Sequence, residues 1–240
     1  MPYLIYIFFG LAPSIVWLLF YLRKDVHPEP KRKVLKVFFF GGLITIPALF
    51  VEEASQAFFQ AIQISKLKIF PVFPLGQVIY TLLGIALWEE LLKYLVVQGV
   101  ILSDPEFDEP VDSMLYMIIS ALGFAAIENI ILFFRLKSSL LLEAFILSSF
   151  RFWGATFLHA LCSGAIGYFL ALSFFRLKDR EELLILGLGI STLLHGFYNL
   201  SIMEIEGIEK FILPIIILGG LALFISWGFK RLRAHGAYNT

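Results

Sequence analysis

The stretch from Gly76 to Ile101 reads GQVIYTLLGIALWEELLKYLVVQGVI, and it decides both the class of the protein and the place where its chemistry is sought. An apolar run of this length matches the roughly 20 residues that an α-helix needs to cross a bilayer. Three ionisable residues, Glu89, Glu90 and Lys93, nevertheless lie near its middle. Each charge at that depth costs roughly 2.5–3.5 kcal/mol even on a lenient insertion scale, so such residues usually face a polar interior and have a function there.

The rest of the chain has the same apolar character. Of its 240 residues, 59% are hydrophobic and only 16% are charged, with a mean hydropathy of +0.85. We therefore predict an all-α fold, a polytopic bundle of seven or eight transmembrane helices that forms one domain over residues 1–240. The net charge of zero gives no reason to expect a nucleic-acid partner. The single cysteine, Cys162, excludes an internal disulfide and a cysteine-based metal cluster.

The apolar runs define the expected spanning helices. We place them at residues 3–22, 37–62, 76–101, 113–134, 151–175, 183–203 and 211–229. Residues 138–150 are a candidate for an eighth, short helix at the membrane interface, and Pro71 and Pro74 should break the chain before the third span.

Basic residues orient this bundle. With the N-terminus outside and the C-terminus in the cytoplasm, most of the 19 Lys and Arg residues fall on the cytoplasmic side, as the positive-inside rule requires. No basic residue precedes the first apolar run, and Arg23-Lys24 follow it, so we expect a retained first helix.

Polar residues interrupt five of these spans. Glu89 and Lys93 are four residues apart and can pair on one helix face, whereas Glu90 points elsewhere. Such an arrangement can leave one carboxylate free to take a proton from water. Glu128 has no basic neighbour within a helical turn, so its partner should come from another helix.

Histidines mark the later spans. His159 shares a face with Ser163 and Gly167, a seam of small residues that lets another helix approach. His195 and Asn199 also share a face, and an imidazole with an amide could bind a developing oxyanion. Each of these groups could instead serve only helix packing.

Earlier in the chain, Glu52-Glu53 is less specific. These two glutamates could line the rim of a polar site, pair with Lys93 or ligate a metal. Motifs for zincins, serine hydrolases and phosphate-binding loops are absent from the sequence.

Together these motifs resemble the PrsW family of membrane proteases, which is related to the CAAX-processing and bacteriocin-processing group. The resemblance covers roughly residues 23–200 and rests on five pieces in order: Asp25-Val26-His27-Pro28-Glu29-Pro30, Glu89-Glu90-Leu91-Leu92-Lys93, Gly123 to Asn129, His159 with Gly164 and Gly167, and His195 to Asn199.

The resemblance implies an endopeptidase of a prokaryotic cell membrane that cleaves membrane-anchored proteins, such as an anti-sigma-factor-like regulator. It implies that the catalytic residues are Glu89, Glu90, Glu128, His159, His195 and Asn199, with Lys93 in support. The family is described both as metal-dependent and as metal-free. If a metal is bound, Zn²⁺ fits, with Glu90, Glu128, His159 and His195 as candidate ligands.

The leading hypothesis is therefore peptide hydrolysis by a water that Glu89 or Glu90 activates. A proton- or cation-coupled transporter is the main alternative, because buried Glu and His chains also form proton relays. A non-catalytic membrane scaffold is the third. Unbroken helices and the lack of a repeat disfavour the transporter.

Overall fold

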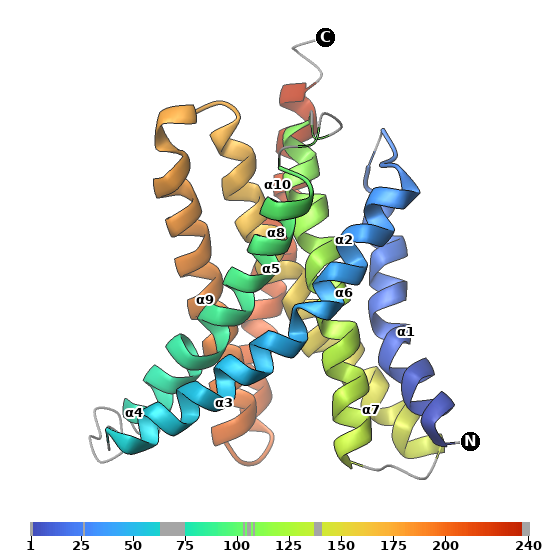
Figure 1. The fold of residues 1–240 in the computed structure, drawn as a ribbon, viewed down its shortest axis with the longest axis vertical. Coiled ribbons are helices and arrows are strands. Elements are labelled where there is room, and N and C mark those ends of the chain that lie inside the picture. Colours follow the sequence, from blue (N-terminus) through green and yellow to red (C-terminus); the bar gives the residue numbers. More distant parts are fainter. Residues whose placement is uncertain are drawn as a thin grey trace.

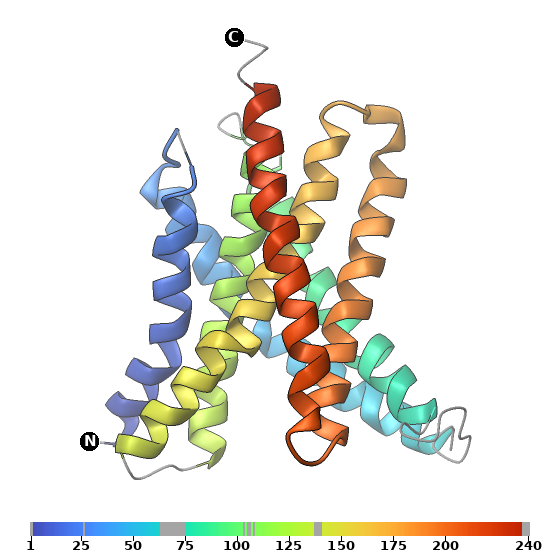
Figure 2. The same ribbon diagram turned by 180° about the vertical axis from the view of Figure 1, so that it is seen from behind.

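The structure, a computed structural model, describes residues 2–25, 27–62, 75–102, 104, 107, 109–136 and 141–236. In this part of the chain every regular element is a helix, as predicted (Figure 1). Seven helical segments are long and apolar enough to cross a membrane, which confirms the predicted bundle. The start of α1 and the end of α10 lie at opposite ends of the bundle, as an odd number of spans requires (Figures 1 and 2).

Several spans contain more than one element. In chain order the elements are α1 (Pro2–Leu22), α2 (Lys31–Leu43), α3 (Thr45–Ala61), α4 (Leu75–Ile79), η2 (Tyr80–Ala86), α5 (Leu87–Val100), α6 (Pro110–Leu136), α7 (Leu141–Trp153), α8 (Ala155–Ser173), η3 (Leu177–Asp179), α9 (Arg180–Glu204), η4 (Glu209–Phe211) and α10 (Ile212–Gly236). The pairs α2–α3 and α7–α8 each form one span, and so does α4–η2–α5.

Two helix ends extend beyond the predicted ones. α2 begins at Lys31 rather than at residue 37, and α10 continues to Gly236 rather than ending at 229. Both extensions are rich in Lys and Arg, whose long side chains reach the polar interface while the backbone stays helical. The helix expected at 138–150 is α7, which begins at Leu141 and joins α8 through Gly154 alone. The break expected at Pro71 and Pro74 lies outside the described residues.

The backbone is irregular between α2 and α3, where a proline explains the break, and in η2, which precedes a candidate site residue. Pro47 has no N–H to donate to the carbonyl of Leu43, and α2 gives way to α3 at Ile44, one residue further on. η2 is a π-helical segment that ends three residues before Glu89. Such π segments inside α-helices occur often at functional sites.

α6 is the central helix, and small residues let its neighbours approach closely. A Cβ on Gly123 would lie 2.0 Å from the carbonyl oxygen of Phe38 in α2, and one on Gly41 would lie 2.2 Å from that of Ser120. On the other side of α6, a Cβ on Gly167 of α8 would lie 2.5 Å from the Cα of Met114. The close approach expected at Gly123 and along the Ser163–Gly167 seam is confirmed.

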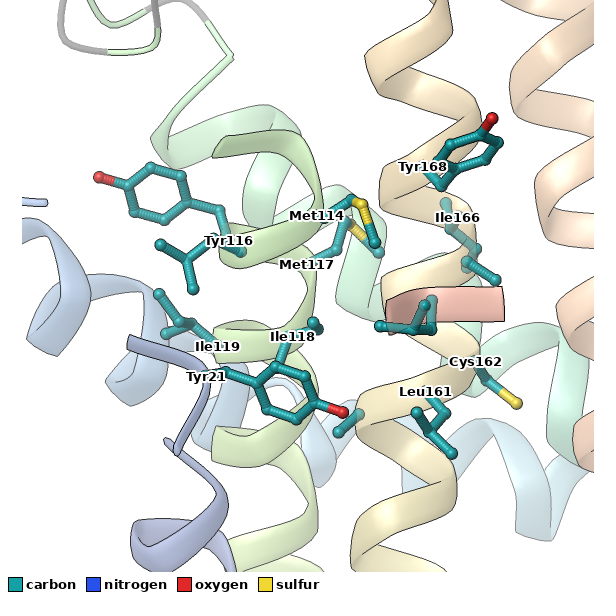
Figure 3. Close-up of a cluster of buried hydrophobic side chains, with 14 of the residues drawn as sticks. Tyr21, Met114, Tyr116, Met117, Ile118, Ile119, Leu161, Cys162, Ile166 and Tyr168 are labelled. Atoms are coloured by element: carbon teal, nitrogen blue, oxygen red, sulfur yellow. The ribbon is translucent and has the colours of Figure 1, made fainter. Parts of the chain in front are cut away.

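Between α6 and α8 lies the largest apolar core. Met114 and Ile118 of α6 lie beside α8, which contributes Leu161, Ile166 and Tyr168 to the same buried cluster (Figure 3). In a bilayer this packing stabilises the bundle through van der Waals contact, since lipid tails are as apolar as the core. The same rigid α6–α8 pair carries Glu128 and His159.

Candidate active site

Five ionisable residues from four helices meet inside the bundle. Glu89 and Glu90 come from α5, Glu128 from α6, His159 from α8 and His195 from α9. Ion-pair distances of 2.8–3.8 Å link them into one connected group. The fold therefore brings together five residues that the sequence places on four separate spans.

Glu90 is the most enclosed member of this cluster. Its Oε1 lies 2.9 Å from Lys93 Nζ and 2.9 Å from His195 Nδ1, and its Oε2 accepts a hydrogen bond of 2.7 Å from Ser163 Oγ. Its side chain is fully buried. A carboxylate saturated in this way holds its neighbours in place and has little capacity left to accept a proton from water. Ser163, expected in the small-residue seam, is thus also a hydrogen-bond donor to Glu90.

The same contacts assign the histidine tautomers. The ammonium of Lys93 donates to His159 Nδ1 at 2.7 Å, so the proton of neutral His159 lies on Nε2 and points to Glu128 Oε2 at 2.8 Å. In His195 the proton lies on Nδ1 and points to Glu90, which leaves Nε2 with a lone pair.

Glu89 lies opposite both lone pairs. Its Oε2 is 3.6 Å from His159 Nδ1 and 3.8 Å from His195 Nε2. Three acceptor atoms, one from each of these residues, lie within 4.8 Å of one another. Acceptors repel one another unless a cation lies between them, and Lys93 Nζ, 3.4 Å from Glu89 Oε2, fills that role for Glu89 and His159.

This donor set fits a metal ion. One carboxylate and two imidazoles form a common ligand set for catalytic zinc, with a fourth position open. The second nitrogen of each imidazole is bonded to a carboxylate, as outer partners of metal-bound histidines usually are. The converging group contains Glu89, whereas Glu90 and Glu128, two of the ligands expected from the sequence, bond to the far side of the imidazoles.

Arg151 is a member of the site that the sequence analysis missed. Its Nη2 lies 2.9 Å from Glu128 Oε2, and its Nε donates to Asn129 Oδ1. Asn129 in turn donates to Thr156 Oγ1 at 3.0 Å and to the carbonyl of Gly10 at 3.3 Å. The Arg151–Glu128–His159 chain therefore connects the imidazole to α1, α6 and α7. A signal was present: Arg151 stands at the start of the predicted span 151–175 that carries His159, and Glu128 has no basic neighbour within a turn of its own helix.

The remaining candidates lie at the edge of the site. Glu52 is half-buried and interacts electrostatically with Glu89, Glu128 and Lys93, whereas Glu53 is exposed. Asn199 is half-buried, one turn beyond His195, and its side chain makes no hydrogen bond within the described residues.

The side chains of the cluster differ in how much of their surface is exposed. Glu128 has a side chain that is 31% exposed, whereas those of Glu89, His159 and His195 are 8% or less. The accessible edge of the cluster therefore lies beside Glu128.

Comparisons with known proteins agree with this geometry. A family model described as PrsW family intramembrane metalloprotease matches residues 29–227. A protease PrsW from Geobacillus kaustophilus is 30% identical over 82% of this chain and 79% of its own length. Relatives of the same name from Oceanobacillus iheyensis and Bacillus subtilis are 28% and 27% identical, over 87% and 96% of this chain and 88% and 95% of theirs. No solved structure gives a significant match.

Proposed function

The chain belongs to the PrsW family of intramembrane proteases, and we propose that the cluster around Glu89 is the site where it hydrolyses peptide bonds of membrane-anchored protein substrates. It is thus a membrane-embedded peptidase rather than the proton- or cation-coupled transporter considered from the sequence. One observation carries the proposal for the site: three acceptor atoms from α5, α8 and α9 converge within 4.8 Å beside a buried lysine.

Glu89 is the general base in this proposal. Each of its contacts with Lys93, His159 and His195 is 3.4 Å or longer, so its carboxylate keeps lone pairs for water. Glu90, saturated by Lys93, His195 and Ser163, positions the imidazole and the ammonium instead. This difference favours Glu89 over Glu90, a choice that the sequence left open.

The histidines hold or move protons at defined atoms. His195 Nε2 has no hydrogen-bond donor among the described residues, so it can take a proton during peptide-bond cleavage and return it to the leaving amine, whereas His159 Nδ1 already accepts the hydrogen bond from Lys93. With its proton on Nδ1, His195 presents no N–H at Nε2, so this proposal gives it a proton-accepting role and leaves the oxyanion role expected for His195 and Asn199 to Asn199. Asn199 is the remaining candidate for that role, since its amide has no partner within the described part of the chain.

A metal ion would be held by Glu89, His159 and His195, and Glu89 would then be a ligand instead of the general base. When bound, such an ion acts as a Lewis acid on the peptide carbonyl and on the attacking water. Glu128 and Glu90 would fix the two imidazoles through their N–H groups. Metal analysis of the purified protein, with cleavage measured before and after chelation, tests this part directly.

Substrates would reach the site past Glu128, which lies in the half of α6 that ends on the face where α1 begins (Figure 1). With the N-terminus outside, that face is extracytoplasmic, and the cut falls in the outer juxtamembrane region of the substrate. A pair of exposed positions tests the orientation in a Cys162→Ala background. An impermeant maleimide should label Phe134→Cys in intact cells and Leu177→Cys only after lysis. The reverse pattern would reject the orientation.

The general-base role is tested by cleavage of a fluorescently labelled single-pass substrate in proteoliposomes. Glu89→Gln keeps size and removes the carboxylate, so we expect the rate to fall about 10²-fold or more. Glu53→Gln, an exposed glutamate on α3, is the matched control and should cleave at the wild-type rate. Glu89→Gln with near wild-type activity and unchanged thermal stability would rule out the assignment.

A further inference from the structure

A separate groove lies between α1 and α10, on the side of the bundle shown in Figure 2. It has a volume of about 260 Å³, and Phe157 of α8 contributes to its lining. It opens where α1 and α10 reach the same face of the bundle, which is the cytoplasmic face in the predicted orientation (Figure 2).

The walls of this groove are aromatic and apolar. Trp17 of α1 stacks on Phe157, with ring centroids 4.2 Å apart, and Tyr21 stacks on Phe229 of α10 at 6.2 Å. Ala222 and Ile225 complete the α10 side. These stacked rings give a fixed surface for a hydrocarbon chain.

The mouth of the groove is basic. Lys24 at the end of α1 meets Lys230 and Arg233 near the end of α10. None of the three forms an ion pair within the described residues. Nε and Nη2 of Arg233 are buried and have no hydrogen-bond partner in that part of the chain. A buried charged donor without a partner is costly, so these atoms indicate an acceptor that lies outside the described residues.

We propose that this groove binds one anionic phospholipid, with an acyl chain on the aromatic walls and the headgroup phosphate on Lys24, Lys230 and Arg233. An apolar slot that ends in unpaired cations matches the shape and charge of such a lipid. The groove lies among side chains that face the membrane: Phe20, Leu223 and Trp227 are 44%, 76% and 48% exposed. Its ligand therefore enters from the bilayer, and basic clusters at the cytoplasmic surface favour anionic headgroups.

Native mass spectrometry of the detergent-purified full chain tests the proposal, with phosphatidylglycerol and phosphatidylcholine of identical acyl chains as probes. We expect wild-type protein to retain phosphatidylglycerol about tenfold or more above phosphatidylcholine. The charge variant Lys24→Gln/Lys230→Gln/Arg233→Gln should lose this preference. Ser226→Trp, which fills the groove from its exposed rim, should lower retention of phosphatidylglycerol without changing the charge.

Arg23→Gln is the control for the charge variant, because this exposed residue is adjacent to Lys24 in sequence but does not line the groove. It should bind lipid like the wild type. Equal retention of both lipids, or full retention of phosphatidylglycerol by the charge variant, would overturn the proposal. So would displacement of phosphatidylglycerol by millimolar inorganic phosphate, since the site would then recognise phosphate alone. The cleavage assay is not used here, so the proposed active site is tested independently.

Discussion

Replacing Arg151 with Gln tests whether a residue that touches no reacting atom sets the activity of the site. Arg151 holds Glu128 at 2.9 Å, and Glu128 holds His159 at 2.8 Å through the same carboxylate oxygen. The Arg151–Glu128 contact is a partly exposed ion pair without a hydrogen bond from Nη2, and its role is to align the carboxylate for the charge-assisted hydrogen bond with His159, which is worth about 1.5–3 kcal/mol. Since 1.4 kcal/mol is a factor of ten, we expect kcat to fall about 10–100-fold, in line with losses of outer partners at histidine sites. KM should change little, because Arg151 orients His159 rather than the substrate.

The assay is steady-state cleavage of the labelled substrate in proteoliposomes, with thermal unfolding of each variant measured in parallel. Arg151→Lys keeps the charge but loses the forked geometry that also reaches Asn129, so it should recover part of kcat. Arg135→Gln, which removes an exposed positive charge from α6, is the control and should behave like wild type. A fall in the melting temperature of Arg151→Gln with kcat unchanged would refute the positioning role and leave a structural one.

Two further predictions concern folding. Gly123→Ala should lower the free energy of unfolding by about 1–3 kcal/mol, because its Cβ would lie 2.0 Å from the Phe38 carbonyl oxygen. Gly99→Ala is the control and should not lower it, since a Cβ on Gly99 would have nothing within 4 Å. Equal melting temperatures of the two variants in detergent would contradict this prediction. The second prediction concerns Asp25 in the α1–α2 loop, where burial raises the pKa of the carboxyl group. The folded state therefore holds this proton more tightly than the unfolded state does. The protein should lose stability as the pH rises from the ordinary carboxyl range toward the raised pKa. Asp25→Asn keeps the acceptor for the His27 N–H and should be more stable than wild type above that window but not below it, and a stability difference independent of pH would count against the explanation.

How much of this the sequence could predict depends on the range of each interaction. The pairing of Glu89 with Lys93 is local, because helix geometry alone places residues four apart on one face. The number of spans follows from apolar length in the same way. Convergence of Glu89, His159 and His195 was predictable only from the cost of isolated charge in a membrane, which requires polar partners but does not say which atoms meet.

The features of the site that could not be predicted from the sequence depend on how the helices pack against one another. The order of contacts around Glu90 depends on how α5, α8 and α9 rotate against one another, and the close approach of α9 to α8 at Gly187 and to η2 at Gly196 contributes to that arrangement. The π-helical segment before Glu89 leaves no periodic signal in the sequence.

The choice between the metal-dependent and the metal-free descriptions of the family depends on one lone pair in this chain. His159 Nδ1 either accepts a hydrogen bond from Lys93 or ligates a metal ion, and it cannot do both. In the structure this lone pair accepts a hydrogen bond from Lys93 Nζ at 2.7 Å. The same ammonium donates to Glu90 at 2.9 Å and lies 4.5 Å from the ring centre of Phe124. A metal at this site must therefore compete with a fixed internal cation that neutralises the same carboxylates. Its affinity is then expected to depend on how readily Lys93 can turn toward Glu90 alone, so the residue that supports the metal-free site also limits metal binding.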